Sequence, residues 1–187
     1  MTSLTPSQIA DLLNRPGPLS LHAFDLSEAD LDKANLSGAN LSEANLAKAN
    51  LFWANLGKAN LFWANLIEAD LTGANLSRAL LIGANLARAN LSGVVLFEAN
   101  LSKADLSGAN LSKANLSRAN LSRANLSRAF LTGADLTRAN LSKANLSEAL
   151  YDDATKWPDG FDPVAADAMK VDQQPSDETS TDQSGLA

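Results

Sequence analysis

The stretch Asn115–Phe130, NLSRANLSRANLSRAF, contains the same five letters three times in succession. The five-residue unit continues in both directions, from Phe24 to Asp153, and makes 26 units. The central position is Leu in 25 units, and the position two before it is Ala in 24. The position directly before the centre is Asn or Asp in 22 units, and the two positions after it vary. Regularity on this scale is typical of repeat architectures, in which each unit packs on its neighbours.

A period of five fits neither regular secondary structure. In an α-helix, successive leucines would be about 140° apart and would face every side. In a straight strand, side chains alternate with a period of two, so successive leucines would face opposite sides. The pattern is satisfied if the chain bends in every unit, so that Leu and Ala face a common axis. A bend of about 90° per unit closes a square coil after about 20 residues, although the periodicity alone leaves a three-sided coil open.

The tandem A(N/D)LxX units resemble the pentapeptide-repeat family, and the run YDDATKWPDGFDP from Tyr151 to Pro163 is similar to the end of cyanobacterial members. The resemblance covers about 130 of the 187 residues. It implies an all-β fold, a right-handed quadrilateral β-helix (solenoid) of about 6–7 coils, because four of the 26 units make one coil. In that fold we expect Leu to fill the axis and Asn or Asp to form stacked polar ladders.

The composition divides the chain into four segments. We expect an N-terminal capping segment with a short helix, the pentapeptide-repeat β-helix, a C-terminal cap and a disordered acidic tail. The tail is polar and has no aromatic residue, so it cannot bury enough apolar surface to fold. The segments are 1–23, 24–153, 154–170 and 171–187.

Both ends of a coil stack expose unpaired backbone edges, so we expect caps. The run TPSQIADLLNR predicts a short helix, with Thr5 as N-cap, Pro6 at the first helical position and Gln8 completing a capping box. Three apolar residues of the C-terminal cap are expected to cover the last coil: Trp157, Phe161 and Val164.

The net charge of −6 is unevenly placed. Residues 24–148 hold 12 Lys/Arg and 11 Asp/Glu, whereas residues 149–187 hold 2 and 9. The acidity therefore belongs to the C-terminal part and says little about the repeats. The start of the chain has no export signal, and no run of about 18 apolar residues exists, so we expect no membrane span and a cytoplasmic location.

The chain lacks the residues that catalytic and metal sites need. It has no Cys and a single His, His22, and one imidazole does not make a metal site. The many Ser residues occupy a repeat position, and no Gly-rich phosphate loop is present. We therefore expect no enzyme activity, no catalytic residue, no cofactor and no metal.

With four units per coil, residue n lies above residue n+20 on the same wall. Glu28, Lys48, Glu68 and Arg88 then alternate in sign along one wall. We interpret this column as a structural charge ladder, with a modest contribution from each exposed pair.

Apolar side chains occupy several outward positions that elsewhere carry Ser, Lys or Asn. Scattered exposed apolar residues are normal, but a contiguous patch marks an interface. In this register, two Phe–Trp pairs fall on opposite walls, and four further apolar residues lie near these pairs. The candidate partner interface consists of Phe52, Trp53, Phe62, Trp63, Ile67, Leu80, Ile82 and Phe97.

Cationic side chains stack on two adjacent walls farther along the rod. This candidate basic patch is either a solvated face, a site for an anionic partner, or a site for the chain's own acidic tail. We do not expect nucleic acid, because no aromatic platform is interleaved with these cations. The patch consists of Lys103, Arg118, Arg123, Arg138 and Lys143.

These features predict a non-enzymatic scaffold that mediates protein–protein interaction. The partner is an unidentified protein or a second copy of the chain. One alternative follows from the resemblance, because some relatives protect DNA gyrase by imitating duplex DNA with a strongly acidic rod. In this chain, residues 24–148 carry a net charge of +1. The other alternative is a binder of an anionic partner through the basic wall.

Overall fold

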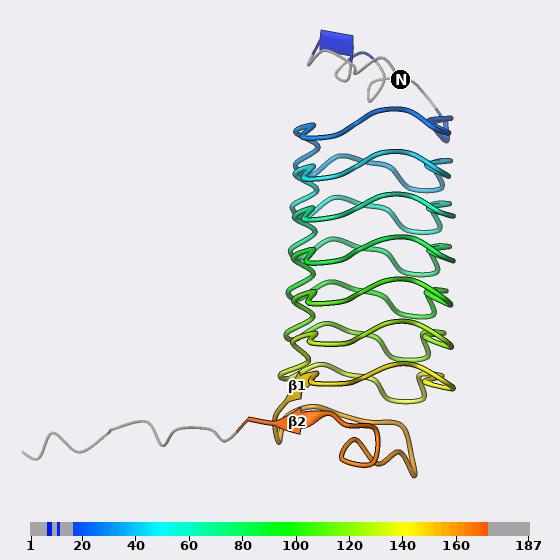
Figure 1. Ribbon diagram of the computed structural model, residues 1–187. Helices are drawn as coiled ribbons and strands as arrows, with labels where there is room; N and C mark the ends of the chain where they lie inside the picture. The colour runs from blue at the N-terminus through cyan, green and yellow to red at the C-terminus, as the bar shows by residue number, and fades with distance from the viewer. Residues whose placement is uncertain (1–6, 9–10, 12–16, 172–187) are drawn as a thin grey trace, which may run out of the picture.

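The computed structural model describes residues 7–8, 11 and 17–171 of the chain, which winds into stacked coils along one axis (Figure 1). Parallel backbone bridges join Ser20 to Asn40 and Asp25 to Asn45, and they continue every five residues as far as Phe130 and Leu150. Each of these bridges connects residues 20 positions apart. Four units therefore complete one coil, which confirms the predicted β-helix and excludes the three-sided alternative.

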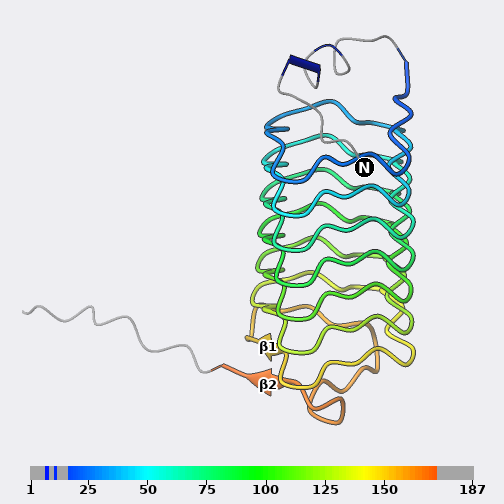
Figure 2. The same cartoon turned by 45° about the horizontal axis from the view of Figure 1, so that its top comes forward.

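Leu and Ala line the interior of the coils, as predicted from the period of five. Every central leucine from Leu36 to Leu136 is 1% exposed or less, and the inward-facing repeat alanines from Ala39 to Ala134 are equally buried. Seen obliquely, the coils form superposed rings around one axis (Figure 2). Burial of these side chains in a single column makes each coil depend on the coils above and below it.

The chain bends because each unit contains a β-turn. In the unit that follows Leu26, the Leu26 carbonyl accepts a hydrogen bond from the Ala29 N–H at 3.2 Å, and Glu28 has a φ of 59°. A positive φ recurs at every fifth position from Ala23 to Glu148, which identifies type II turns. Gly or Asn usually occupies this position. Lys, Arg and Glu occupy this position in most units of this chain. Stacking of the coils therefore overrides the conformational penalty of roughly 1–2 kcal/mol that a left-handed backbone costs a residue with a Cβ atom.

The Asn/Asp position has two roles. The Asn65 amide donates to Asn45 Oδ1 at 3.0 Å, which confirms the predicted ladder between coils. Asn65 Oδ1 also accepts the backbone N–H of Ile67 at 3.2 Å, so the side chain holds the turn of its own unit. This second role, typical of Asx-turns, explains why Asn or Asp occupies the position in most units.

The regular coil ends near Tyr151. Asp135 pairs with Lys156, which is 21 residues later, so one residue has been added to the repeat. Strand β1 (Leu150–Tyr151) then pairs in parallel with β2 (Met169–Lys170), with Leu150 opposite Met169.

The C-terminal cap rests on an aromatic cluster. Trp157 stacks on Phe161 with ring centroids 5.2 Å apart and meets Tyr151 edge to face at 5.5 Å. Trp157 and Phe161 pack against the core, as predicted. The prediction for Val164 is wrong, because its side chain is 67% exposed. The Asp162 carboxylate accepts the Val164 N–H at 2.9 Å and holds a turn from which Val164 faces solvent.

The predicted N-terminal helix lies largely outside the described residues. Ser7, Gln8 and Asp11 are helical, whereas Thr5 and Pro6 are not described. The predicted tail beyond Val171 also lies outside the described part. In the part that is described, no helix has the length and apolarity needed to cross a bilayer.

Candidate interaction surfaces

Two Phe–Trp pairs project from the rod. Phe52 meets Trp53 edge to face at 6.3 Å, and Phe62 meets Trp63 at 6.0 Å. Both indole side chains are 61% exposed. Such exposure is unusual for Trp, whose large apolar surface is normally highly buried.

Each Trp lies against a glycine of the next coil. A Cβ atom added to Gly73 would lie 2.8 Å from Cε2 of Trp53, and one on Gly83 would lie 3.1 Å from Cε2 of Trp63. The glycines thus leave the space that the rings occupy. Sequence analysis missed this arrangement, although a glycine 20 residues after each Trp was a readable signal.

The structure distributes the eight predicted interface residues over all four walls. One wall carries a contiguous set, which we call the aromatic wall: Phe62, Trp63, Leu80 and Ile82. Its members are linked through the coil register, since the Trp63 N–H donates to the Ile82 carbonyl at 3.1 Å. Leu80 replaces a ladder Asn and is 45% exposed. The remaining four residues lie on the other walls: Phe52, Trp53, Ile67 and Phe97.

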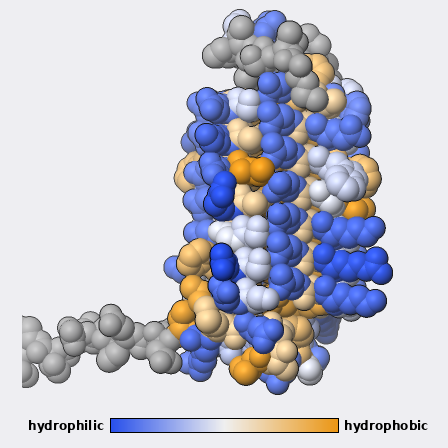
Figure 3. Space-filling model, viewed as in Figure 1, coloured by the Kyte–Doolittle hydropathy of each residue, from blue (hydrophilic) through white to orange (hydrophobic). Residues whose placement is uncertain are grey.

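The candidate basic patch divides into paired and unpaired cations. Arg118 Nη1 lies 3.2 Å from Glu98 Oε1, and its guanidinium carbon lies 5.6 Å from the centre of the Phe97 ring. Lys103, Arg123 and Lys143 stack on the wall that carries Trp63, and within residues 17–171 no ion pair forms at any of them or at Arg138. Figure 3 shows hydrophilic side chains projecting in a row from the right-hand edge of the rod.

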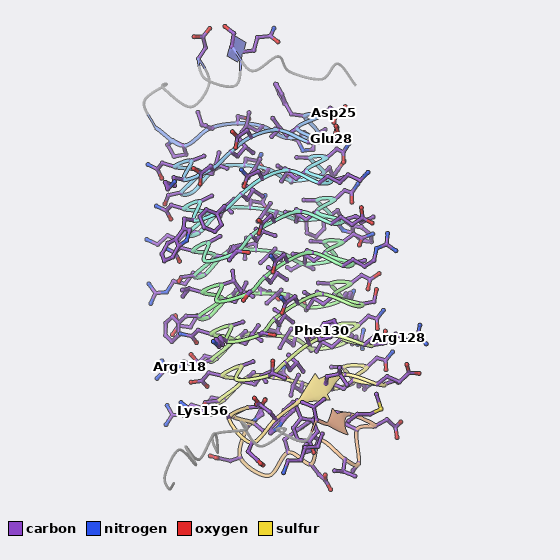
Figure 4. The ribbon with its side chains drawn as sticks, turned by 90° about the vertical axis from the view of Figure 1, so that its left-hand side faces the viewer. Asp25, Glu28, Arg118, Arg128, Phe130 and Lys156 are labelled. Carbon is purple, nitrogen blue, oxygen red and sulfur yellow. The ribbon has the colours of Figure 1, made fainter. Side chains whose placement is uncertain are left out.

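Ion pairs also connect coils on a third wall, the one that carries the predicted charge ladder. Arg88 Nη2 lies 2.7 Å from Glu68 Oε1, so the predicted alternating ladder forms at this step, whereas Glu28 and Lys48 make no ion pair with described residues. Arg128 Nε lies 2.8 Å from Glu148 Oε2. Figure 4 shows Arg118 and Lys156 on one side of the rod and Arg128 on the other.

Glu98 lies between two arginines. Arg78 Nε donates to its carboxylate at 2.9 Å, and Arg118 lies on the other side. The Arg78 hydrogen bond, and then that of Arg118, hold the pKa of Glu98 below the ordinary value of 4.5. This exposed carboxylate therefore contributes stability above its ordinary pKa.

We expect an NMR titration of the Glu98 carboxyl carbon to give a pKa below 4.5. Because the pKa is lowered in the folded state, the stabilisation is present above the unfolded-state value and is lost as the pH falls through the folded-state value. Arg78→Ala should raise the Glu98 pKa. An identical titration curve in this variant would show that the ion pair does not persist in solution.

The remaining polar features do not form a chemical site. A groove of about 390 Å³ lies between Arg88 and Arg128 over Gly108, but both arginines already pair with glutamates, so the groove is close to neutral. His22 Nδ1 lies 2.9 Å from both the carbonyl and the hydroxyl oxygen of Ser42. Among the described residues, no group of three His, Cys, Asp or Glu side chains is placed to hold a metal ion.

Comparisons with known proteins agree with this geometry. The sequence profile described as pentapeptide repeats matches in eight copies, over residues 25–61, 59–96, 74–112 and 114–150. A comparison with curated proteins finds no match.

Solved structures include similar chains. The pentapeptide repeat protein alr5209 from Nostoc Pcc 7120 is 38% identical, with a TM-score of 0.54 over 55% of this chain and 84% of that one. HetL of Nostoc sp. strain PCC 7120, a pentapeptide repeat protein involved in heterocyst differentiation regulation, is 37% identical over 80% of this chain and 71% of its own, with a TM-score of 0.25. QnrB1, a plasmid-mediated fluoroquinolone resistance protein, is 18% identical over 81% of each chain, with a TM-score of 0.42.

Proposed function

Because this chain belongs to the pentapeptide-repeat family, we propose that it is a non-enzymatic scaffold whose rod of about 6–7 right-handed coils presents side chains to a protein partner. The observation that carries this proposal is the aromatic wall. Large apolar side chains occupy outward repeat positions there, beside coils in which the same positions are polar. The partner is a second protein or another copy of this chain, and we place the encounter in the cytoplasm.

The aromatic wall has the properties of a binding hot spot, the small set of residues that supplies most of the binding free energy. Trp is enriched among the few residues that dominate interface energies, and a contiguous apolar patch rimmed by polar groups marks an interaction site. The Trp63 ring rests against Gly83, and the backbone beneath it is fixed by hydrogen bonds to the neighbouring coils. Pre-organisation of this kind lowers the entropy that is lost on binding.

The gyrase-protection alternative has less support. Imitation of DNA requires an acidic surface, whereas the aromatic wall continues into unpaired Lys103, Arg123 and Lys143. A supercoiling assay with purified gyrase tests it directly, because inhibition at micromolar protein would favour this alternative over the scaffold.

We expect Trp63→Ser to weaken association by at least about 30-fold, which corresponds to the roughly 2 kcal/mol of an interface hot spot. Sedimentation velocity measures self-association, and quantitative pull-down measures binding of a second protein. The matched control is Trp53→Ser, which removes an equally exposed indole from the opposite wall. Equal binding by the parent and both variants would rule out the aromatic wall as the interface.

A second substitution tests whether the position of the Trp63 ring matters for binding while the ring itself is kept. Gly83→Ala places a Cβ 3.1 Å from the Trp63 ring and should tilt it, so binding should weaken while near-ultraviolet circular dichroism changes. Gly93→Ala is the control, because its φ of 65° is nearly the same and nothing lies within 4 Å of the added atom. Both variants introduce the same left-handed alanine, so a difference between them reports on Trp63 alone.

A further inference from the structure

The backbone edge at the C-terminal end of the rod is only partly closed. In the regular coils, the N–H groups of the central Leu and of the residue two after it donate to the next coil. The Leu121 N–H donates to the Asn140 carbonyl at 2.9 Å, and the Arg123 N–H donates to the Ser142 carbonyl at 2.9 Å. One coil later, the corresponding N–H groups of Leu141 and Lys143 have no acceptor in the part of the chain that the structure describes.

The cap closes the rest of the same coil. The Leu136 N–H reaches the Lys156 carbonyl at 2.7 Å, and the Glu148 N–H reaches the Asp167 carbonyl at 3.0 Å. The cap does not follow the wall between these two points, because the residue added before Lys156 takes the chain out of the repeat. Four backbone donors therefore lie unpaired along one stretch of edge within residues 17–171: Arg138, Leu141, Lys143 and Leu146.

A groove runs along this stretch of edge. It has a volume of about 350 Å³ and lies between Leu141 and Ser142 of the last coil and Pro158 and Phe161 of the cap. Leu141 is 8% exposed, whereas Leu121 one coil earlier is fully buried. The groove thus offers apolar surface together with open donors, which is the combination that β-augmentation uses.

The charge around the groove favours an acidic occupant. Arg138 and Lys143 project from the two walls that meet here, and neither makes an ion pair with described residues. Asp159 lines the groove and supplies one opposing charge. Arg123 and Lys103 continue the unpaired cations away from the groove, so the local balance is positive.

The course of β2 indicates which segment can reach this edge. β2 pairs in parallel with β1, with Tyr151 opposite Lys170, so the chain at Val171 circles the rod in the same direction as the coils. At five residues per wall, this direction leads to the wall of Lys156 and then to the wall of Lys143. Residues 172–187 could span roughly 50 Å if extended, which is ample for this path.

We propose that residues 172–187 dock along this open edge as an added β-segment and complete the last coil. The segment contains four acidic residues, Asp172, Asp177, Glu178 and Asp182, and no Lys or Arg. Its carboxylates complement Arg138 and Lys143, and its backbone carbonyls accept the four open N–H groups. Pro175 is compatible with this placement, because an outermost strand tolerates proline. The contact blocks the edge against pairing with other chains and is weakened by salt.

Amide hydrogen exchange of the full chain tests the proposal at low ionic strength. Deletion of residues 172–187 should accelerate exchange at Leu141 and Lys143 by at least about 10-fold, the factor for a loss of roughly 1.4 kcal/mol of protection. Exchange at Leu121 and Arg123, one coil away, should stay unchanged. Adding a synthetic peptide of residues 172–187 to the truncated protein should restore protection.

A charge variant supplies the second measurement. Asp172→Asn, Asp177→Asn, Glu178→Gln and Asp182→Asn together should remove most of the salt-sensitive protection while the length of the segment is kept. Equal exchange rates at Leu141 and Lys143 in the full and truncated chains would overturn the proposal. A fall in sedimenting mass from dimer to monomer on truncation would also overturn it, because the segment would then dock on a second copy.

Discussion

Leu86→Asn is expected to lower the free energy of unfolding by about 3–5 kcal/mol, because Leu86 lies in the middle of the rod and is fully buried. The substitution leaves a cavity and places an amide in a column lined by Leu and Ala, where it finds no hydrogen-bond partner. Urea denaturation followed by circular dichroism measures the change.

Two matched variants define this expectation. Leu86→Met keeps nearly the same volume and should cost less than about 1.5 kcal/mol. Leu26→Asn makes the same chemical change in the first coil, where the described residues stack on one side only and Leu26 is 3% exposed, and it should cost less than Leu86→Asn. A loss below about 1 kcal/mol for Leu86→Asn would contradict a dry interior at this level.

Deletion of one residue, Ser112, is expected to abolish cooperative folding of the rod, whereas deletion of the 20 residues 104–123 should leave it folded. The 20-residue deletion removes one complete coil and restores every contact between the coils that remain. The single deletion shifts all later side chains by one position, so leucines leave the axis and polar residues enter it. The chain itself shows that its coils do not absorb a shift, because one added residue before Lys156 coincides with the end of the repeat.

Circular dichroism and thermal unfolding distinguish the two deletions. The variant without residues 104–123 should retain a single transition, and the variant without Ser112 should lose it or show a broad, weakened one. Similar transitions in both would mean that the stack accommodates a shift in register.

The period of five was sufficient to predict a bend in every unit and the burial of Leu and Ala, because both follow from one repeating geometry. The four walls and the Asn ladder were expected from the resemblance to the pentapeptide-repeat family, since the periodicity alone left a three-sided coil open. Side-chain pairing within a wall was less predictable. Arg118 belonged to the predicted basic patch, but Glu98 and Phe97 lie within its reach, and a register of 20 does not say which rotamer a long side chain adopts. The turn position was also missed, since local propensity favours Gly or Asn where Glu28 and Lys48 stand at positive φ.

The cap was the least predictable part of the chain. Val164 is apolar and close to Phe161 in the sequence, yet the turn at Asp162 directs it to solvent. The open edge at Leu141 could not be predicted, because it depends on the path by which the cap leaves the repeat. Outside the repeat, periodicity gives no information about where the backbone goes.

The half-coil offset between Trp53 and Trp63 has a geometrical consequence. Their two indoles project from opposite walls on either side of the buried leucine column, at nearly the same height along the rod. A protein held by Trp63 would therefore lie across the full thickness of the rod from Trp53. The opposite side of the molecule would stay open to solvent while Trp63 is covered.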